Sequence, residues 1–442
     1  MTLAELQATA PIAEEPAAPA LTPLRRLGAI LGGSAGNLVE WYDWFAYASF
    51  TIYFAKVFFP TGDQTSQWLQ AAAIFAVGFL ARPVGAWIMG LYADRAGRRA
   101  ALTLSVSLMC LGSLMVAMIP GYNRIGVWAP VLLTTARLVQ GLSLGGEYGA
   151  SATYLSEMAG KAHRGFWSSF QFVTLIGGQL VALGVLIALQ HTLTPAALDS
   201  WGWRVPFVIG AGLAVVVFWV RLGLDESHSF KAREAGARST TMRLVREHPK
   251  ETWMIFALTA AGSLAFYAFT TYMQKFLTNT AHFSKTQATE ITAWSLVWYM
   301  AFQPVCGWLG DKFGRRVVMA GGFGLLGLAS WPILASLAGQ TSPFVAFLLV
   351  AAALTCLSGY TAVNAVVKAE LFPTHIRALG VALPYALANA IFGGTAEYSA
   401  LWFKQAKLEQ GFYVYVAIAC LIGCAVTARM RDTQASSRIL ED

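Results

Sequence analysis

Long apolar stretches follow one another along almost the whole chain, and this feature limits what the chain can fold into more than any other. Each stretch is near the ~20 residues that a helix needs to cross a bilayer. Hydrophobic residues make up 56% of the 442 residues and charged residues only 12%, which excludes a surface that faces water on all sides. We therefore predict an all-α membrane protein. The twelve expected transmembrane helices lie near residues 29–54, 67–91, 100–120, 127–156, 165–190, 205–222, 252–277, 288–309, 317–338, 343–371, 379–402 and 412–429.

The positively charged residues indicate how the helices are oriented. Most of the 31 Lys and Arg residues fall in the tails and the even-numbered loops, and loops rich in these residues are typically cytosolic. We expect a multi-pass protein of the cell (inner) membrane with both termini in the cytosol. Because the basic residues are spread over short loops and form no single aromatic-rich patch, the sequence argues against nucleic-acid binding.

The chain repeats itself on the two sides of its longest hydrophilic stretch. Residues 90–99 (GLYADRAGRR) and 307–316 (GWLGDKFGRR) share a Gly-x-x-x-Asp-Arg/Lys-x-Gly-Arg-Arg motif after the second and eighth helices. Two parallel six-helix halves are expected, with a binding site between them near mid-membrane and alternating access by rocking of one half on the other. The expected parts are a disordered cytosolic tail (1–26), an N-terminal six-helix bundle (27–222), a cytosolic linker (223–250), a C-terminal six-helix bundle (251–430) and a second cytosolic tail (431–442).

The repeated motif resembles the loop signature of the major facilitator superfamily, and its occurrence twice at these positions makes the resemblance specific. Three further stretches resemble the metabolite:proton symporter branch of that family: residues 36–43 (GNLVEWYD), 78–85 (GFLARPVG) and 137–148 (RLVQGLSLGGEY). The resemblance implies the major facilitator fold and the proton as coupling ion, with no other cofactor. Residues 168–179, 270–275 and 368–373 are similar to a dicarboxylate carrier within the branch, which implies alpha-ketoglutarate as the first candidate substrate.

Several alternatives remain open at this point. Citrate, shikimate and proline or betaine are the other substrates that the branch suggests, although several buried basic residues favour an acid over a zwitterion. A sensor that binds without transporting is also open. An enzyme is disfavoured, because the apolar stretches contain no metal-binding or nucleophilic constellation, and no metal is expected. The expected partners are the lipid bilayer and a small organic anion, and we expect a monomer.

Eight charged residues lie inside the apolar stretches. In contact with lipid each would cost ~2.5–3.5 kcal/mol, so they are expected to face the interior of the bundle. They are Glu40, Asp43, Arg82, Arg137, Glu147, Lys275, Lys368 and Glu397. A rise of ~1.5 Å per residue predicts two layers in the first half: Glu40, Arg82 and Glu147 in the lower layer, and Asp43 and Arg137 in the upper one.

Arg82 and Arg137 are the first candidates for binding a substrate carboxylate. A guanidinium group matches a planar carboxylate with two parallel hydrogen bonds. The alternative for both arginines is a structural ion pair that holds helices together. We rank Arg82 ahead of Arg137.

Coupling to protons requires a group that gains and loses a proton as its exposure changes. The six histidines lie in loops or at the ends of the predicted helices, so the candidates are carboxylates. We rank Asp43 and Glu40 ahead of Glu147, for which a permanent pair with Arg82 is an equal alternative.

The seventh and tenth helices supply four further candidates for substrate contact: Tyr267, Gln274, Lys275 and Asn364. The first three share one helical face with Thr271 by their i, i+4, i+7, i+8 spacing. Lys275 has snorkelling to the membrane interface as its alternative, and Glu397 is expected at the same height. We interpret Lys368, near the cytosolic end of the tenth helix, as structural.

The repeated loops are predicted to act as conformational latches on the cytosolic side. The resemblance implies that Asp94 with Arg98, and Asp311 with Arg315, hold the two halves together in the outward-open state. A carboxylate near a helix N-terminus is favoured by the helix dipole. Retention of positive charge in the cytosol is the alternative, and both roles can hold together.

The fourth helix carries four glycines on one side: Gly141, Gly145, Gly146 and Gly149. Small residues at such spacing let two membrane helices approach closely. We expect close packing of this helix against a neighbour.

Overall fold

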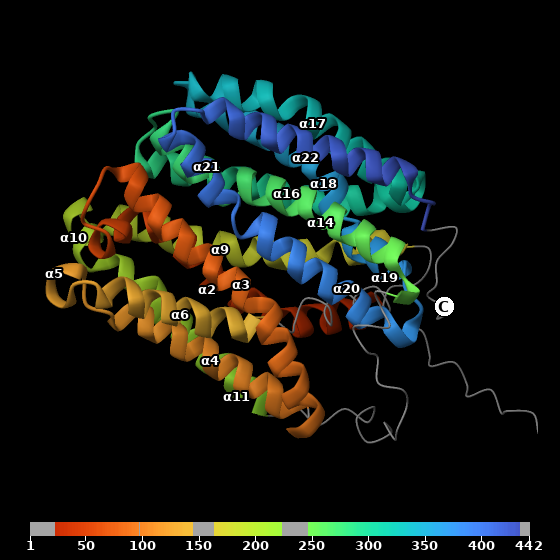
Figure 1. The fold of residues 1–442 in the computed structure, drawn as a ribbon, viewed down its shortest axis with the longest axis horizontal. Coiled ribbons are helices and arrows are strands. Elements are labelled where there is room, and N and C mark those ends of the chain that lie inside the picture. The colour runs from red at the N-terminus through yellow and green to blue at the C-terminus, as the bar shows by residue number, and fades with distance from the viewer. Residues whose placement is uncertain (1–22, 97, 145–162, 223–245, 434–442) are drawn as a thin grey trace, which may run out of the picture.

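The computed structural model describes residues 23–96, 98–144, 163–222 and 246–433, and the ordered elements within these ranges are helices (Figure 1). The first half contains α2 (Pro23–Phe58), α3 (Gln64–Ala96), α4 (Arg98–Met118), α5 (Tyr122–Ile125), α6 (Trp128–Leu144), α8 (Arg164–Ser168), α9 (Phe170–Thr192), α10 (Pro195–Ser200), η2 (Gly202–Arg204) and α11 (Val205–Leu222). The second half contains α14 (Pro249–Phe269), α15 (Met273–Asn279), α16 (Lys285–Phe313), α17 (Arg315–Ala338), α18 (Pro343–Thr361), α19 (Asn364–Glu370), α20 (Thr374–Ala388), η3 (Asn389–Gly393), α21 (Ala396–Gln405) and α22 (Glu409–Arg429).

These helices occupy the stretches in which twelve transmembrane segments are predicted. Within the described residues, eight helical stretches are long and apolar enough to cross a membrane by length and composition. The other predicted segments correspond to α2, α4, α6 and α16. Helices α2 and α16 are long, at 36 and 29 residues, but they carry many of the polar side chains described below.

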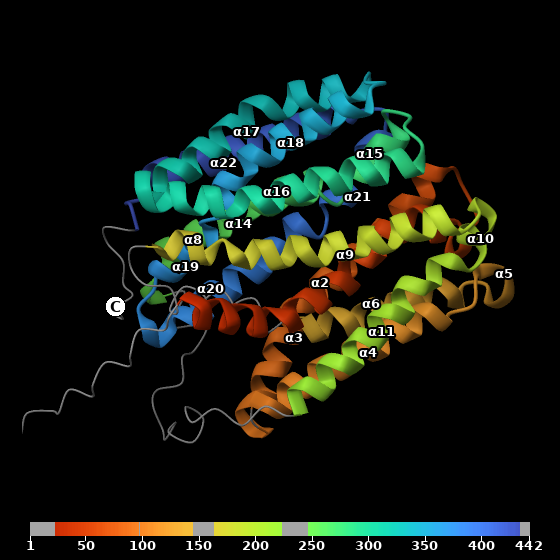
Figure 2. The ribbon, with the colours of Figure 1, turned by 180° about the vertical axis from the view of Figure 1, so that it is seen from behind.

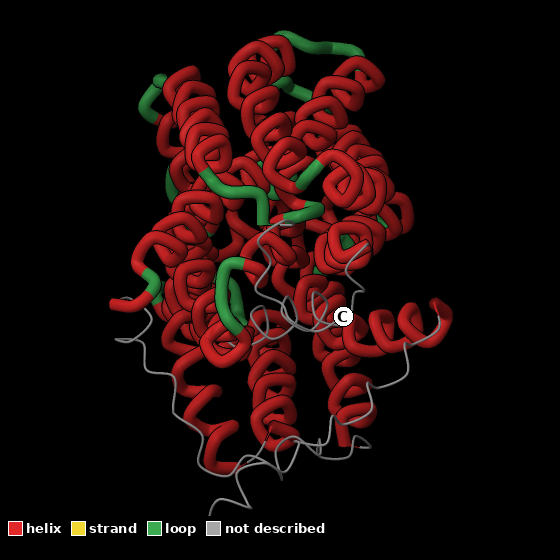
Figure 3. The backbone as a smooth tube through the Cα atoms, turned by 90° about the vertical axis from the view of Figure 1, so that its right-hand side faces the viewer, coloured by secondary structure: helices red, strands yellow, loops and turns green. Residues whose placement is uncertain are grey.

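The helices form two bundles that lie against each other, and this confirms the predicted two-half architecture. In Figures 1 and 2, α2, α3, α4, α6, α9 and α11 make one bundle, and α14 to α22 make the other. The bundles meet where α9 packs on α16 and where α3 packs on α21 and η3. An end-on view shows both bundles as groups of roughly aligned helices (Figure 3).

Different helix ends lie at the two ends of the molecule. One end holds the start of α2, the end of α3, the start of α4 and the end of α22, and we call it the terminal end (Figure 1). The opposite end holds α5 and α10, and we call it the α10 end. The charge distribution predicts that the terminal end is cytosolic.

Three predicted spans of the second half are interrupted helices. The seventh span breaks between α14 and α15, the tenth between α18 and α19, and the eleventh passes through the π-helical η3 between α20 and α21. Breaks of this kind within a membrane occur where the backbone is buried in protein or lines a cavity. The sequence analysis assumed continuous helices, and it missed these interruptions.

Close helix contacts rely on glycine at several points. A Cβ atom on Gly141 of α6 would lie 2.1 Å from the carbonyl oxygen of Gly78 in α3. A Cβ atom on Gly85 of α3 would lie 2.2 Å from the carbonyl oxygen of Leu142 in α6. The expected close packing at Gly141 is therefore present. Gly145, Gly146 and Gly149 lie outside the described residues.

Candidate functional site

Arg82 extends from α3 into an aromatic pocket at the contact between the two halves. Its guanidinium carbon lies 4.0 Å from the ring centroid of Trp44, 4.1 Å from that of Phe79 and 5.2 Å from that of Trp41. The side chain is buried, and its Nε and Nη2 atoms have no hydrogen-bond partner among the described residues. Stacking on aromatic faces stabilises a guanidinium charge, while its N–H groups stay available to an acceptor.

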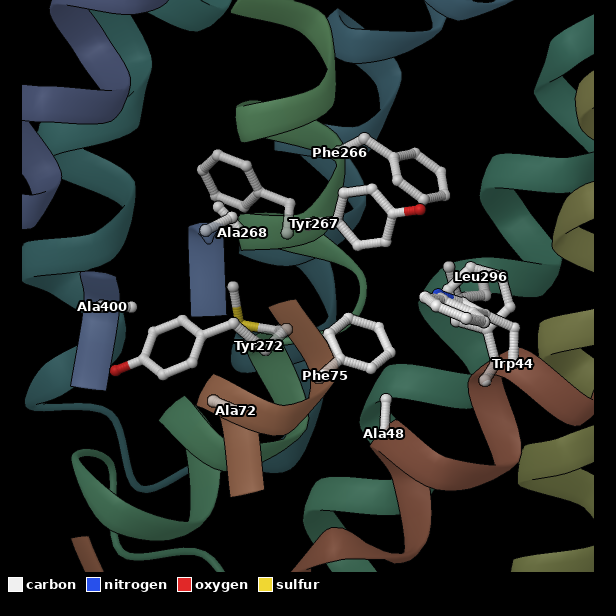
Figure 4. Packing of buried hydrophobic residues seen from close by; sticks show 14 of the residues in the cluster. Trp44, Ala48, Ala72, Phe75, Phe266, Tyr267, Ala268, Tyr272, Leu296 and Ala400 are labelled. Atoms are coloured by element: carbon white, nitrogen blue, oxygen red, sulfur yellow. The ribbon is translucent and has the colours of Figure 1, made fainter. Parts of the chain in front are cut away.

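The second half closes over Arg82 with tyrosines. Tyr267 of α14 lies close enough to interact with Arg82 and with Asn389 of η3. Tyr385 of α20 lies close enough to interact electrostatically with both Arg82 and Tyr267. Figure 4 shows side chains of both halves in this region, with Trp44 and Phe75 from the first and Tyr267 and Tyr272 from the second. Arg82 and Tyr267 are thus brought together as predicted site residues.

Glu40 lies on α2 in the same layer as Arg82. It is buried, and its charge is near enough to Arg82 to interact with it. This agrees with the predicted lower layer. Glu147, the third residue expected in that layer, lies outside the described residues.

Asp43 is the centre of a buried hydrogen-bond network inside the first half. Its carboxylate accepts a hydrogen bond from the Ser113 hydroxyl of α4 and one of 2.5 Å from the Gln140 amide of α6. The carbonyl oxygen of the same amide accepts a hydrogen bond of 2.6 Å from Arg137. Asp43 and Arg137 are therefore connected through Gln140 and do not form a direct salt bridge.

Arg137 is the second stacked guanidinium of the first half. Its carbon lies 4.0 Å from the Trp44 ring centroid and 4.4 Å from that of Tyr47. Trp44 therefore contacts both Arg82 and Arg137. The Nε and Nη2 atoms of Arg137 are buried and have no hydrogen-bond partner within the described part of the chain.

Lys275 forms a buried ion pair that also touches the first half. Its ammonium lies 2.8 Å from the Glu397 carboxylate of α21, and both side chains are almost fully buried. The same ammonium donates a hydrogen bond of 2.9 Å to the backbone carbonyl of Ala48 in α2. Lys275 and Glu397 thus lie at matching height, as predicted, and Lys275 is not a snorkelling residue.

Gln274 is separated from Tyr267 by an interruption of the helix at residues 270–272. The backbone N–H of Tyr272 bonds to the carbonyl of Tyr267, five residues earlier. The Gln274 amide donates to the Thr289 hydroxyl at 2.9 Å, and the Gln190 amide of α9 donates to the same hydroxyl at 3.2 Å. The continuous helix on which the predicted shared face depends is therefore not present.

Polar contacts between the halves gather toward the α10 end. Asn279 donates to Thr65, and Gln405 donates to Ser66 at 2.7 Å. Ser66 in turn donates to Asp63 from both its hydroxyl and its backbone N–H, and these bonds lower the pKa of the Asp63 carboxyl by favouring its charged form. The Asn279–Thr65 and Gln405–Ser66 bonds connect the two halves toward the α10 end.

Asn364 and Lys368 share a buried polar face of the tenth span. The Lys368 ammonium donates to the Asn364 side-chain oxygen at 3.0 Å and to the Tyr360 hydroxyl at 3.3 Å. It also lies 4.8 Å from the ring centroid of Tyr385. Tyr360, Asn364 and Lys368 therefore lie together despite the break between α18 and α19.

The second repeated loop connects the two halves at the terminal end. Asp311, near the end of α16, accepts hydrogen bonds of 2.7 and 2.9 Å from the backbone N–H groups of Gly165 and Phe166 in the first half. Arg315 lies 3.5 Å from Asp311 and forms an ion pair with Glu370 of α19. This geometry fits the predicted latch. Asp94 lies near the end of α3 and Arg98 begins α4, and their side chains are not among those described.

Several site residues escaped the sequence analysis. Ser113, Gln140 and Tyr385 are uncharged, so they produce no signal in a search for charges within apolar stretches. The ion pair of Glu370 with Arg315 depends on the fold, because the two residues belong to different helices. Lys368 was noticed and interpreted as structural.

The arrangement is that of a membrane transporter built from two bundles with a polar centre, and comparison with known proteins agrees. Residues 29–251 match the family "Sugar (and other) transporter", and residues 255–440 match "Major Facilitator Superfamily". The chain belongs to the major facilitator superfamily.

Curated relatives are similar over nearly the full chain. The alpha-ketoglutarate permease of Escherichia coli (strain K12) is 50% identical over 403 residues, which are 91% of this chain and 93% of the relative. A citrate-proton symporter of Klebsiella pneumoniae is 33% identical over 404 residues, covering 89% of this chain and 90% of the relative.

Solved structures share the fold at low sequence identity. The crystal structure of a D-xylose-proton symporter matches with a TM-score of 0.75 at 16% identity and covers 94% of this chain and 100% of that one. A partially occluded inward-open form of the xylose transporter XylE from E. coli matches with a TM-score of 0.69 at 18% identity, covering 90% and 96%.

Proposed function

We propose that this protein carries a small dicarboxylate, most specifically alpha-ketoglutarate, across the membrane together with protons. The observation that carries the proposal is Arg82. Its guanidinium is buried where the halves meet and is flanked by aromatic rings, and its Nε and Nη2 atoms have no acceptor among the described residues. A carboxylate that enters between the halves satisfies these donors with the two-bond geometry that guanidinium prefers.

The identity of the substrate is supported by the relatives. The printed name of the 50% identical relative is alpha-ketoglutarate permease, and those of the 33% identical relatives are citrate-proton symporters. Both substrates are small carboxylic acids, and an acid is the partner that a centre with several buried cations favours.

Asp43 is our first choice for the proton carrier. It is buried, and its hydrogen-bond partners Ser113 and Gln140 can satisfy either a charged or a protonated carboxyl group after small rotations. Through Gln140 its charge state is linked to Arg137, which packs on the same tryptophan as Arg82. Glu40, in the layer of Arg82, is the second choice, and Glu147 the third.

Movement between the halves provides alternating access in this proposal. Polar contacts toward the α10 end and the Asp311 contact at the terminal end join the same two bundles at opposite ends. Transport then requires these contacts to break in turn. We place the terminal end in the cytosol and the protein in the cell inner membrane, working as a monomer.

A competition assay tests the substrate. The full-length protein is reconstituted in liposomes, and uptake of labelled alpha-ketoglutarate is measured with excess unlabelled alpha-ketoglutarate, citrate, shikimate, proline or betaine. We expect alpha-ketoglutarate to compete best. Stronger competition by another compound would reassign the substrate, and binding without any uptake would indicate a sensor.

A further inference from the structure

The second half carries a buried cation that the site described so far does not use. The ammonium of Lys368 is fully buried in α19, just after the interruption of the tenth span. It contacts the Asn364 amide oxygen, the Tyr360 hydroxyl and the face of Tyr385. These groups place it on the inner side of the second bundle.

A row of tyrosines connects Lys368 to Arg82. Tyr385 lies 4.8 Å from the Lys368 ammonium and close enough to Arg82 to interact electrostatically with it, so both buried cations lie near one partly exposed ring. Arg82 belongs to the first half and Lys368 to the second. The two positive charges therefore face the same cluster of hydroxyl groups from opposite sides.

The backbone makes specific room for this cluster. A Cβ atom on Gly262 would lie 1.9 Å from Cε1 of Tyr360, and one on Gly393 would lie 2.5 Å from the Asn389 oxygen and 2.9 Å from the Tyr267 ring. Only glycine permits both tyrosines to take these positions. The interruption at residues 362–363 places Asn364 and Lys368 beside them, as expected where a broken helix borders a ligand site.

We propose that Lys368 binds the second carboxylate of the substrate, opposite Arg82, and thereby gives the protein its preference for dicarboxylates. A dianion bound between two cations is attracted by both of them. A monocarboxylate can satisfy Arg82 only. The inference rests on the proposed function, and it adds the residue that distinguishes dicarboxylates from monocarboxylates.

The test compares two ligands of matched shape. Alpha-ketoglutarate and 2-oxopentanoate have the same carbon chain and the same 2-oxo acid end, but the second has a methyl group in place of the distal carboxylate. Binding of both is measured on the purified full-length protein for the wild type, Lys368→Gln, Lys368→Met and Arg82→Gln. Lys404→Gln serves as the control, because Lys404 pairs with Glu409 toward the α10 end.

Loss of a charge-assisted contact corresponds to about a tenfold to hundredfold change in affinity. We expect Lys368→Gln to weaken alpha-ketoglutarate binding by that factor and to leave 2-oxopentanoate binding within about twofold. Arg82→Gln should weaken both ligands, and Lys404→Gln neither. The ratio of the affinities for the two ligands does not depend on what fraction of a variant is folded. Lys368→Met is the second variant, because its apolar side chain can be buried if glutamine destabilises the site.

Three results would contradict either this inference or the proposed function, and they can be told apart. If the lysine variants keep the wild-type ratio, the inference is wrong. It is also wrong if the wild type binds the two ligands equally. If the wild type binds neither ligand, the proposed function itself fails.

Discussion

Among the described residues, the Arg82 guanidinium is surrounded by aromatic rings and has no acidic side chain in hydrogen-bond contact. The three rings around its guanidinium belong to α2 and α3, so the first half alone fixes its position. The second half contributes Tyr267 and Tyr385. Arg82 is therefore rigidly held by one half and covered by the other, which suits a residue that must bind substrate in both conformations.

Replacement of Arg82 by glutamine should abolish transport. Two charge-assisted hydrogen bonds of ~1.5–3 kcal/mol each correspond to a loss of more than about a hundredfold in affinity. Initial uptake rates in liposomes, normalised to the amount of inserted protein, measure the effect. Arg82→Lys should recover part of the activity, because it keeps the charge without the two-bond geometry. Wild-type kinetics for Arg82→Gln would remove Arg82 from the site.

Replacement of Asp43 by asparagine should separate transport from the proton gradient. Asparagine keeps the shape and can bond to Ser113 and Gln140 in their present positions, but it does not take up a proton. Exchange of labelled for unlabelled substrate should persist, whereas uptake should no longer respond to an imposed pH gradient. Retained pH-driven accumulation would exclude Asp43 as the proton carrier.

At the scale of single residues, the sequence predicted which charged residues lie inside the bundle, but it predicted fewer of the residues that they contact. The cost of a charge in lipid identified the eight embedded residues, and helix rise placed Lys275 level with Glu397. The link between Asp43 and Arg137 was missed, because Gln140 is neutral and its role depends on which helices are neighbours.

Helix packing depends on glycine where a tyrosine side chain needs the space. Gly262→Ala should lower both stability and transport, because the added methyl group would overlap Tyr360. Overpacking of this kind typically costs about 1–3 kcal/mol. Thermal unfolding of the purified protein and liposome uptake are the measurements. Gly321→Ala in α17 is the matched control, since nothing lies within 4 Å of its added Cβ, and equal behaviour of the two variants would contradict the packing argument.

The Asp311 contact predicts a conformational effect at the terminal end. Asp311→Ala removes the acceptor for the Gly165 and Phe166 N–H groups, so it should favour separation of the two halves there. Spin labels at Tyr92 and Val317, both exposed, in a background without native cysteines, report that separation. We expect a larger population of long distances. Asp63→Ala, toward the opposite end, should leave the distribution unchanged, and an unchanged distribution in Asp311→Ala would show that the contact is no latch.

At the scale of helices, the sequence patterns did not predict the interruptions within the spans. Helix breaks are normally marked by proline or glycine, yet residues 270–272 (TTY) and 362–363 (AV) contain neither. Hydropathy is continuous across both breaks. A spacing rule that assumes a continuous helix therefore does not apply across residues 270–272, although Lys368 still bonds to Asn364 four residues earlier within α19.

The overall architecture of the molecule was predicted more completely than its helix breaks or its side-chain contacts. Apolar length and the repeated loop motif indicate two similar halves without any knowledge of side-chain contacts. The predicted architecture is confirmed by the two bundles and by the family match. The roles of individual residues depend on the interface, because Arg82 of the first half comes near Tyr385 and Lys368 of the second half only where the two halves meet.

Proton-driven accumulation tests the central claim most directly. A dianion entering a cell works against ~2.3 kcal/mol per charge per 100 mV, and co-transport of protons offsets that barrier. The reconstituted protein is given labelled alpha-ketoglutarate and an inward proton gradient, with the membrane potential clamped to zero. The account predicts accumulation above the external concentration that collapses on addition of a protonophore. Uptake that only equilibrates, and is the same with and without the gradient, would contradict it.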